Sequence, residues 1–122
     1  MGTRSMIGVC NEDGSVTATY CHYDGYLAHN GRVLVEHYNT PETARAVAES
    51  GYLSALDDSL EDSIRASVNR EAPTIYNTVE TYLKCGFRNT GANYIYLFDG
   101  QAWFFATERQ KFEEVEMNLE TI

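Results

Sequence analysis

Residues 3–23 read TRSMIGVCNEDGSVTATYCHY, and this stretch predicts the β-hairpin around which the fold is organised. Apolar and β-branched residues alternate with smaller or polar ones on both sides of a cluster of turn-forming residues. The pair Asp13-Gly14 is typical of a two-residue hairpin loop. With this loop, the two strands cover about residues 3–11 and 15–23.

The two-residue loop gives the hairpin an expected register. Counting outward from the loop pairs Ile7 with Tyr20 and Ser5 with His22. These residues then share one face of the hairpin, and the apolar middle of that face is expected to point to the core. Ser5 and His22 would lie side by side at the far end of the same face.

A second hairpin is predicted at about residues 93–107. The sequence NYIYLF-DG-QAWFFAT places Tyr94 opposite Phe105 and Tyr96 opposite Trp103, on one aromatic face. The other face is aliphatic, so both faces are apolar. Either helices cover one face and a second subunit or a ligand covers the other, or the aromatic face packs inside and a further element covers the aliphatic one. The four aromatic side chains are the candidate interface, and a homodimer is the expected state.

The region between the hairpins is predicted to be helical. Apolar spacing favours helices at residues 32–38, at 41–50 after an N-cap at Thr40, at 57–71 and at 74–86. Alternation of apolar and charged residues at the end of the chain favours a further strand over a helix.

These patterns together predict an α+β fold in a single globular domain, residues 1–122. An antiparallel sheet is built from the hairpins at about 3–23 and 93–107, with the C-terminal strand as a candidate addition. Three or four helices pack against this sheet. A chain of 122 residues is large enough to bury one hydrophobic core.

The chain is acidic, with 18 Asp and Glu residues against 9 Lys and Arg and a formal net charge of −9. This balance disfavours direct nucleic-acid binding, because phosphate contacts depend on Lys and Arg. It favours either a role of the charge in solubility or a basic protein partner. No apolar run approaches the roughly 20 residues of a membrane span, and the N-terminus lacks the apolar segment of a secretory signal. A cytoplasmic location is therefore expected.

Three cysteines, Cys10, Cys21 and Cys85, are expected to be free thiols. They form no CxxC pair and no zinc-finger spacing, so no metal site is predicted from them. The chain also lacks the phosphate-binding, dinucleotide-binding, nucleophile-elbow and zinc-protease motifs. No cofactor and no catalytic residue are assigned, and binding is favoured over catalysis.

A candidate ligand site is predicted at the end of the first hairpin, formed by Arg4, Ser5, His22, Asp24 and, in the following loop, His29. Arginine, serine and a backbone turn could hold a phosphate or a carboxylate. His22 with Asp24 could act as a general base with its orienting group. The structural alternative is an ion pair between Arg4 and Asp24, with a hydrogen-bonded His22. A metal site formed by His22, Asp24 and His29 matches no dedicated motif.

Four segments of the chain resemble a group of small proteins encoded by tailed bacteriophages and prophages. They are MGTRSMIGV at 1–9, YCHYDGYLAHNGRVLVEHYNTPE at 20–42, GYLSAL at 51–56 and NYIYLFDGQAWFF at 93–105. Members look like M-x-T-R-S, Y-C-H-W-D-G-Y, H-N-G with an L-x-x-H-Y helix, and Y-x-Y-L-F-x-x-G-x-W, in this order and spacing. Tyr23 stands where tryptophan is commoner, and residues 57–73 differ from the glycine- and charge-rich segment of the group.

The resemblance implies a setting in the cytoplasm of a bacterial host. It also implies the work of a small accessory protein, such as blocking a defence system, sequestering a signalling nucleotide or redirecting a host enzyme. The leading hypothesis is a non-enzymatic protein that binds a host macromolecule, and modulates or inhibits it. The alternative is a binder or enzyme that acts on a small phosphorylated ligand through the candidate ligand site.

A third hypothesis is that the chain mimics DNA. It rests on the acidic residues Asp57, Asp58, Glu61 and Asp62 and on the glutamate-rich C-terminal segment. Solvated faces of helices explain the same charges more simply.

Overall fold

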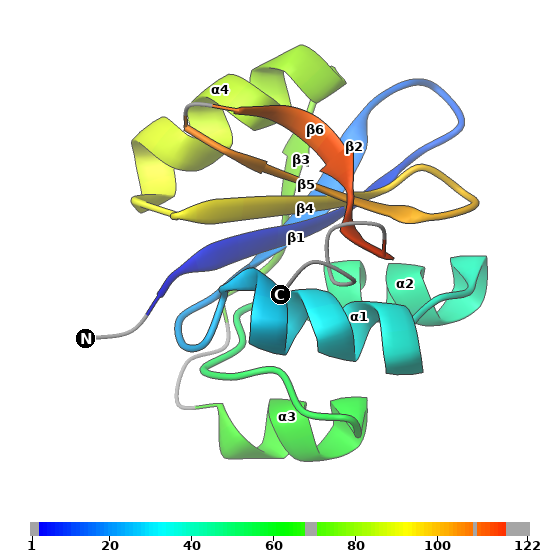
Figure 1. Ribbon diagram of the computed structural model, residues 1–122, viewed down its shortest axis with the longest axis vertical. Helices are drawn as coiled ribbons and strands as arrows, with labels where there is room; N and C mark the ends of the chain where they lie inside the picture. The colour runs from blue at the N-terminus through cyan, green and yellow to red at the C-terminus, as the bar shows by residue number, and fades with distance from the viewer. Residues whose placement is uncertain (1–2, 68–70, 109, 117–122) are drawn as a thin grey trace.

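The computed structural model describes residues 3–67, 71–108 and 110–116. Across these residues, six strands form one sheet in the order β3-β2-β1-β4-β5-β6 (Figure 1). The strands are β1 (Ser5–Cys10), β2 (Val16–Cys21), β3 (Thr74–Tyr76), β4 (Tyr94–Phe98), β5 (Trp103–Thr107) and β6 (Gln110–Glu114). The helical elements are a π-helical turn η1 (Leu27–Gly31), α1 (Arg32–His37), α2 (Pro41–Glu49), α3 (Leu60–Ala66) and α4 (Val79–Thr90).

The architecture confirms the α+β fold, with hairpins β1–β2 and β4–β5 at the predicted places. The sheet is mixed, however, because β1 pairs with β4 in parallel, with Ser5 opposite Tyr94. The expectation of a purely antiparallel sheet is therefore wrong at this one pairing. A parallel pairing needs a long crossover, and the helical segments between the two hairpins supply it.

The first hairpin has a three-residue loop, so the predicted register is wrong by one residue. The Asn11 amide donates to the Ser15 carbonyl at 2.8 Å, which closes the loop around residues 12–14. Gly14 has φ +89°, the left-handed conformation that a three-residue loop requires after its turn.

A one-residue shift exchanges the two faces of a strand. Ser5 lies opposite Cys21, not His22, and Met6 lies opposite Tyr20. The pairing of Ser5 with His22 on which the candidate ligand site depended is therefore absent.

The second hairpin is displaced from its predicted register by two residues, which leaves its faces unchanged. Phe98 pairs with Trp103 and Tyr96 with Phe105 across a four-residue loop. The Asp99 carboxylate organises this loop by accepting hydrogen bonds from the backbone amides of Gln101 and Ala102, each at 2.9 Å.

The aromatic face of this hairpin packs inside the chain. Figure 1 shows α1 and α2 on one side of the sheet and α4 on the other. Tyr96, Trp103 and Phe105 lie in the core beneath α1 and α2, with exposed fractions of 0%, 1% and 5%. Tyr94 packs against the same core and is half-buried.

These aromatic residues are therefore core residues of the chain itself. Trp103 is fixed there by its indole N–H, which donates to the Tyr38 carbonyl at 3.0 Å. The aliphatic face, with Ile95 and Leu97, is covered by α4, whose Tyr82 hydroxyl donates to the Tyr96 carbonyl at 2.7 Å. The arrangement is the second of the two expected, and it leaves the three buried side chains no surface for a second subunit.

The helix predicted at 74–86 begins and ends later than expected. Residues 74–76 form the edge strand β3, and α4 starts after Thr78, whose hydroxyl accepts from the Thr81 amide at 3.0 Å. Gly91, with φ +72°, ends the helix in the left-handed conformation. Gly86 lies within α4, where a side chain would collide with Ile95.

The other local predictions are confirmed in part. Thr40 caps α2 as expected, accepting a hydrogen bond from the Thr43 amide. The predicted loop around His29 is helical, as the turn η1. The C-terminal strand exists as β6, but residues 117–122 lie outside the part of the chain that the structure describes. Within the described ranges, no helix has the length and apolar character to cross a membrane.

Candidate functional site

The predicted site serine is part of a buried polar cluster. Ser5 is 0% exposed, and its hydroxyl accepts a hydrogen bond from the Asn30 side-chain amide at 3.2 Å. The same amide nitrogen lies 3.4 Å from the Cys21 sulfur, and the Asn30 carbonyl oxygen is hydrogen-bonded to His29 Nδ1 at 2.9 Å. Ser5, Cys21, His29 and Asn30 together form what we call the buried staple. Its polar groups bind one another, so it has a structural role.

Asp24 belongs to the turn that holds this staple in place. It has φ +57°, and its carbonyl accepts from the Asn30 amide at 3.3 Å. The next residue, Gly25, donates to the Thr3 carbonyl at 2.7 Å and accepts from the Tyr96 hydroxyl at 2.6 Å. A methyl group at Gly25 would lie 2.7 Å from the Ser5 Cβ, so only glycine fits here. The Asp-Gly pair therefore closes the end of the hairpin onto β1.

Arg4 and His22 lie on the other face of the sheet from Ser5, because successive residues of a strand point to opposite sides. The Arg4 backbone is paired with Asn93, through Asn93 Oδ1 at 3.1 Å and the Asn93 amide at 2.8 Å. His22 Nδ1 is hydrogen-bonded to the Tyr20 hydroxyl at 3.0 Å. In the described part of the chain, Arg4 forms no ion pair with Asp24. The predicted site residues Arg4 and His22 are thus separated from Ser5 by the sheet.

The thiols of Cys10 and Cys21 are not activated. Burial raises the pKa of the Cys21 thiol to about 11, and burial also raises the pKa of Cys10. A raised pKa keeps a thiol protonated at neutral pH, where it is a poor nucleophile. Among the described residues, all three cysteines are free, and no group of three His, Cys, Asp or Glu could hold a metal ion.

On the Arg4 side of the sheet, four rings form a partly exposed surface that we call the aromatic strip: Tyr20, His22, Tyr23 and Tyr52. Ring centroids lie 5.7 Å apart for Tyr52 and Tyr20, and 5.9 Å apart for Tyr20 and His22. His22 and Tyr23 meet edge to face at 4.5 Å. Tyr23 is 48% exposed. The alternation of Tyr20 and His22 along β2 was a usable sequence signal, whereas nothing local indicated Tyr52.

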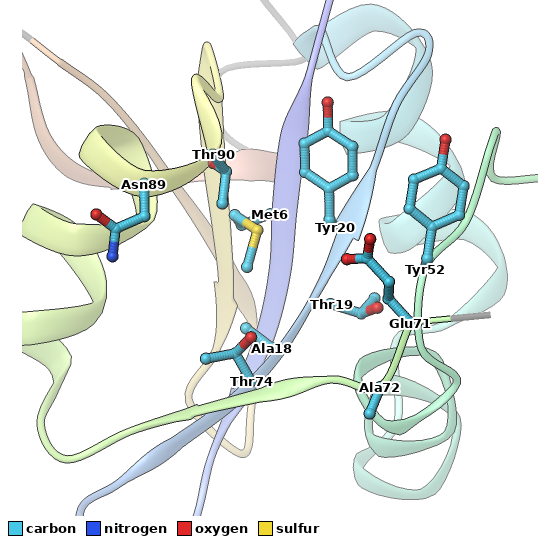
Figure 2. A pocket seen from close by; sticks show the side chains of 10 residues that line it. All are labelled: Met6, Ala18, Thr19, Tyr20, Tyr52, Glu71, Ala72, Thr74, Asn89 and Thr90. Carbon is cyan, nitrogen blue, oxygen red and sulfur yellow. The ribbon is translucent and has the colours of Figure 1, made fainter. Parts of the chain in front are cut away.

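A hollow of about 250 Å³ lies beside the aromatic strip (Figure 2). Met6 and Ala18 line it from the sheet, and Tyr20 and Tyr52 form one of its sides. The last turn of α4 forms the opposite side, as Figure 2 shows. Glu71 also lines the hollow, on the side of the two tyrosines. The hollow therefore combines aromatic rings with a carboxylate.

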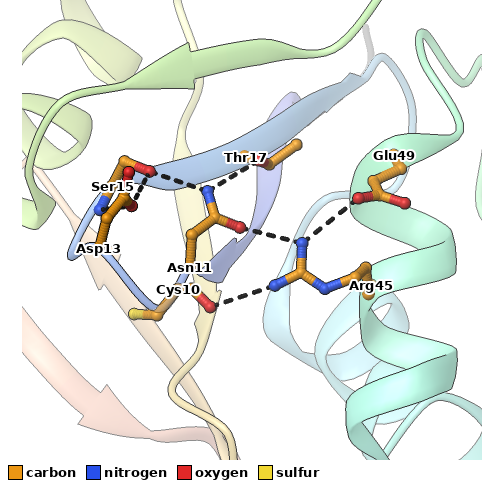
Figure 3. A network of polar contacts seen from close by, with 7 residues as sticks. All are labelled: Cys10, Asn11, Asp13, Ser15, Thr17, Arg45 and Glu49. Carbon is orange, nitrogen blue, oxygen red and sulfur yellow. Dashed lines mark hydrogen bonds and ion pairs between the residues drawn. The ribbon is translucent and has the colours of Figure 1, made fainter.

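A second polar network fastens α2 to the first hairpin (Figure 3). Arg45 donates from Nη1 to Asn11 Oδ1 at 2.9 Å and from Nη2 to the Cys10 carbonyl at 3.3 Å. It also forms an ion pair with Glu49 at 3.3 Å. The Asn11 amide group donates in turn to Ser15 and Thr17, each at 3.0 Å. The role of these contacts is structural.

Four of the acidic residues behind the DNA-mimic hypothesis, Asp57, Asp58, Glu61 and Asp62, lie at or near the start of α3. Two of them, Glu61 and Asp62, pair with Arg65 at 2.7 and 3.1 Å. These pairs are exposed, and surface ion pairs contribute little to stability. Local pairing with Arg65 neutralises part of the acidic surface on which this hypothesis depends.

Comparison with known proteins adds no likeness: none of the protein-family models, curated proteins or solved structures compared with the chain matches it. The fold and the site define the chain as an α+β protein with a mixed sheet, an exposed aromatic strip and a neighbouring hollow. The evidence on function comes from these features.

Proposed function

We propose that this chain is a non-catalytic binding protein that engages a partner protein through the aromatic strip. The observation that carries the proposal is the strip itself, in which four contacting rings end in Tyr23 at 48% exposure. Tyrosine is enriched at protein interfaces and at the residues that dominate their binding energy. It supplies a large contact area while few rotatable bonds have to be ordered.

Net charge supports a partner with a basic surface. The chain carries a formal charge of −9, and complementary charge speeds association and selects partners. The same charge opposes binding to the phosphate backbone of nucleic acids. We therefore propose a protein partner.

The resemblance to the tailed-bacteriophage group supports a host setting for this interaction. In this proposal the chain works in the cytoplasm of a bacterial host, and its target is a host protein, such as a component of a defence system, that it modulates or inhibits.

The alternative, a small phosphorylated ligand at the predicted site, has less support. Ser5 is fully buried and bound to Asn30, and Arg4 lies on the opposite face. A phosphate could not contact both side chains without a rearrangement of the hairpin end.

The test is affinity capture from a bacterial host lysate with three tagged proteins: the native chain, Tyr23→Ala and Ile75→Ala. Ile75 is 67% exposed on the edge strand β3, so its variant removes an exposed apolar side chain elsewhere. The native chain and Ile75→Ala should capture the same partner in stoichiometric amount, and Tyr23→Ala should lose it. Absence of any partner with the native chain, or equal capture by all three, contradicts the proposal.

A further inference from the structure

We propose that the hollow beside the aromatic strip receives an arginine side chain of the partner protein. This inference rests on the proposed function, because it names the chemical group by which the partner is recognised. It follows from the size of the hollow, its aromatic side, its acceptor groups and the helix that ends against it.

The size of the hollow suits one side chain. At about 250 Å³, it is smaller than the roughly 300–1,000 Å³ of sites that enclose drug-sized molecules such as nucleotides. It is also open at the surface, because Glu71 on one side and Asn89 on the opposite side are both exposed. A side chain that projects from a partner can enter such a hollow without being enclosed completely.

The tyrosine side of the hollow suits a planar cation. The rings of Tyr20 and Tyr52 are inclined at 31° with their centroids 5.7 Å apart, and both residues line the hollow. A guanidinium group stacks on aromatic faces and is attracted by their negative quadrupole. Both tyrosines are half-buried, so the contact is partly shielded from water.

Hydrogen-bond acceptors accompany the rings. Glu71 places a carboxylate among the residues that line the hollow, on the same side as the tyrosines (Figure 2). Guanidinium carries five N–H donors and no acceptor, which matches the acceptor oxygens of a carboxylate.

The helix α4 adds a favourable field. Asn89 and Thr90 stand in its last turn and line the hollow opposite the tyrosines. The C-terminus of a helix carries partial negative charge, and α4, with 12 residues, is the longest helix described here. A cation in the hollow would be attracted by this end of the helix.

Arg4 is a cation beside this surface. Its Nη1 atom lies 3.2 Å from the position that a Cβ atom at Gly91 would take, just past the end of α4. Arg4 does not line the hollow, but its charge repels a second guanidinium. Replacing Arg4 by glutamine should therefore strengthen the binding of a cation, which no ligand of negative charge would do.

The experiment is an NMR titration of the isotope-labelled chain with N-acetyl-arginine methylamide, and with the neutral citrulline analogue as the matched ligand control. The arginine probe should shift the amide signals of Thr19, Tyr20, Tyr52 and Ala72 in a saturable way, and citrulline should not. Glu71→Gln should weaken binding about tenfold, in line with the loss of a charge-assisted hydrogen bond. Glu42→Gln, with the same charge change in the exposed first turn of α2, should leave binding unchanged.

Equal shifts with both probes, or equal weakening by both glutamine variants, would overturn the inference, because a general attraction to an acidic chain would then explain the result. The spectra also report whether each variant is folded. Capture of a partner through Tyr23 without binding of the arginine probe would reject the arginine site alone. Binding of the probe by a chain that captures no partner would reject the proposed function alone.

Discussion

The buried staple and the aromatic strip meet at the end of β2, but they differ in burial and in hydrogen bonding. Cys21 is 0% exposed and hydrogen-bonded to Asn30, while its neighbours Tyr20 and His22 are half-buried on the opposite face. The polar groups of the staple bind one another within the chain. The strip ends in an exposed tyrosine and borders a hollow. Successive residues of a strand point to opposite faces of the sheet. Neighbouring residues at the end of β2 can therefore have different roles, with Cys21 in the folded core and Tyr20 and His22 in the proposed binding surface.

The largest expected effect is on the staple. Gly25→Ala places a methyl group 2.7 Å from the Ser5 Cβ and 2.8 Å from the Thr3 carbonyl oxygen. We expect a loss of about 3 kcal/mol of unfolding free energy, because overpacking against backbone cannot be relieved by a side-chain movement. Urea denaturation measures it. A loss below about 1 kcal/mol would show that the turn is loosely packed. The tight packing that distinguishes the staple from the aromatic strip would then be absent.

The next effect is a pH dependence of stability to which Cys21 of the staple contributes. Burial raises the pKa of Cys21 from 9.0 to about 11, so the folded chain keeps this proton over a range where the unfolded chain loses it. Stability is complete below the unfolded pKa and falls as pH rises through the folded one. At about pH 10, Cys21 should account for a loss on the order of 1 kcal/mol relative to neutral pH.

The contribution of Cys21 can be isolated with Cys21→Ala. Buried tyrosines such as Tyr82 and Tyr96 also have raised pKa values, so stability should still fall in the variant, but less steeply. Unfolding free energies at a series of pH values measure both slopes. Identical slopes in the native chain and the variant would mean that the thiol is accessible to water.

The smallest effect concerns Thr19, whose side chain lies on the core face of β2. Thr19→Val replaces the enclosed, unpartnered hydroxyl by a methyl group of similar shape. Removing a buried polar group that has no partner should stabilise the fold by about 1 kcal/mol. The same variant should bind the arginine probe as the native chain does, because the Thr19 side chain lies on the face of the sheet opposite to that of Tyr20. Thermal unfolding measures the first effect and NMR titration the second. If stability falls instead, the hydroxyl contributes to the fold.

Sequence patterns predicted the elements that depend on neighbours along the chain. Both hairpins and the Thr40 cap follow from local alternation, turn residues and capping chemistry, which act over a few residues. The register of the first hairpin could not be predicted, because Asp13-Gly14 fits a loop of two residues or of three. The difference of one residue in loop length decides which residues of the second strand share a face with Ser5.

Contacts between segments far apart in the sequence could not be predicted either. The parallel pairing of β1 with β4 joins residues about ninety positions apart, and no local pattern specifies it. The predicted site residues were assembled on the wrong register, which paired Ser5 with His22 instead of Cys21. Tyr52 and Glu71 come to the hollow from outside the hairpin, and only the tertiary structure places them there.

The central claim is that the aromatic strip serves binding while the staple serves folding. The most direct test measures, for Tyr23→Ala, both the affinity for the captured partner and the unfolding free energy. The claim predicts a loss of affinity of about thirtyfold, equivalent to about 2 kcal/mol, with a change in stability below about 1 kcal/mol. Unchanged affinity, or a loss of stability large enough to account for the loss of binding, would contradict it.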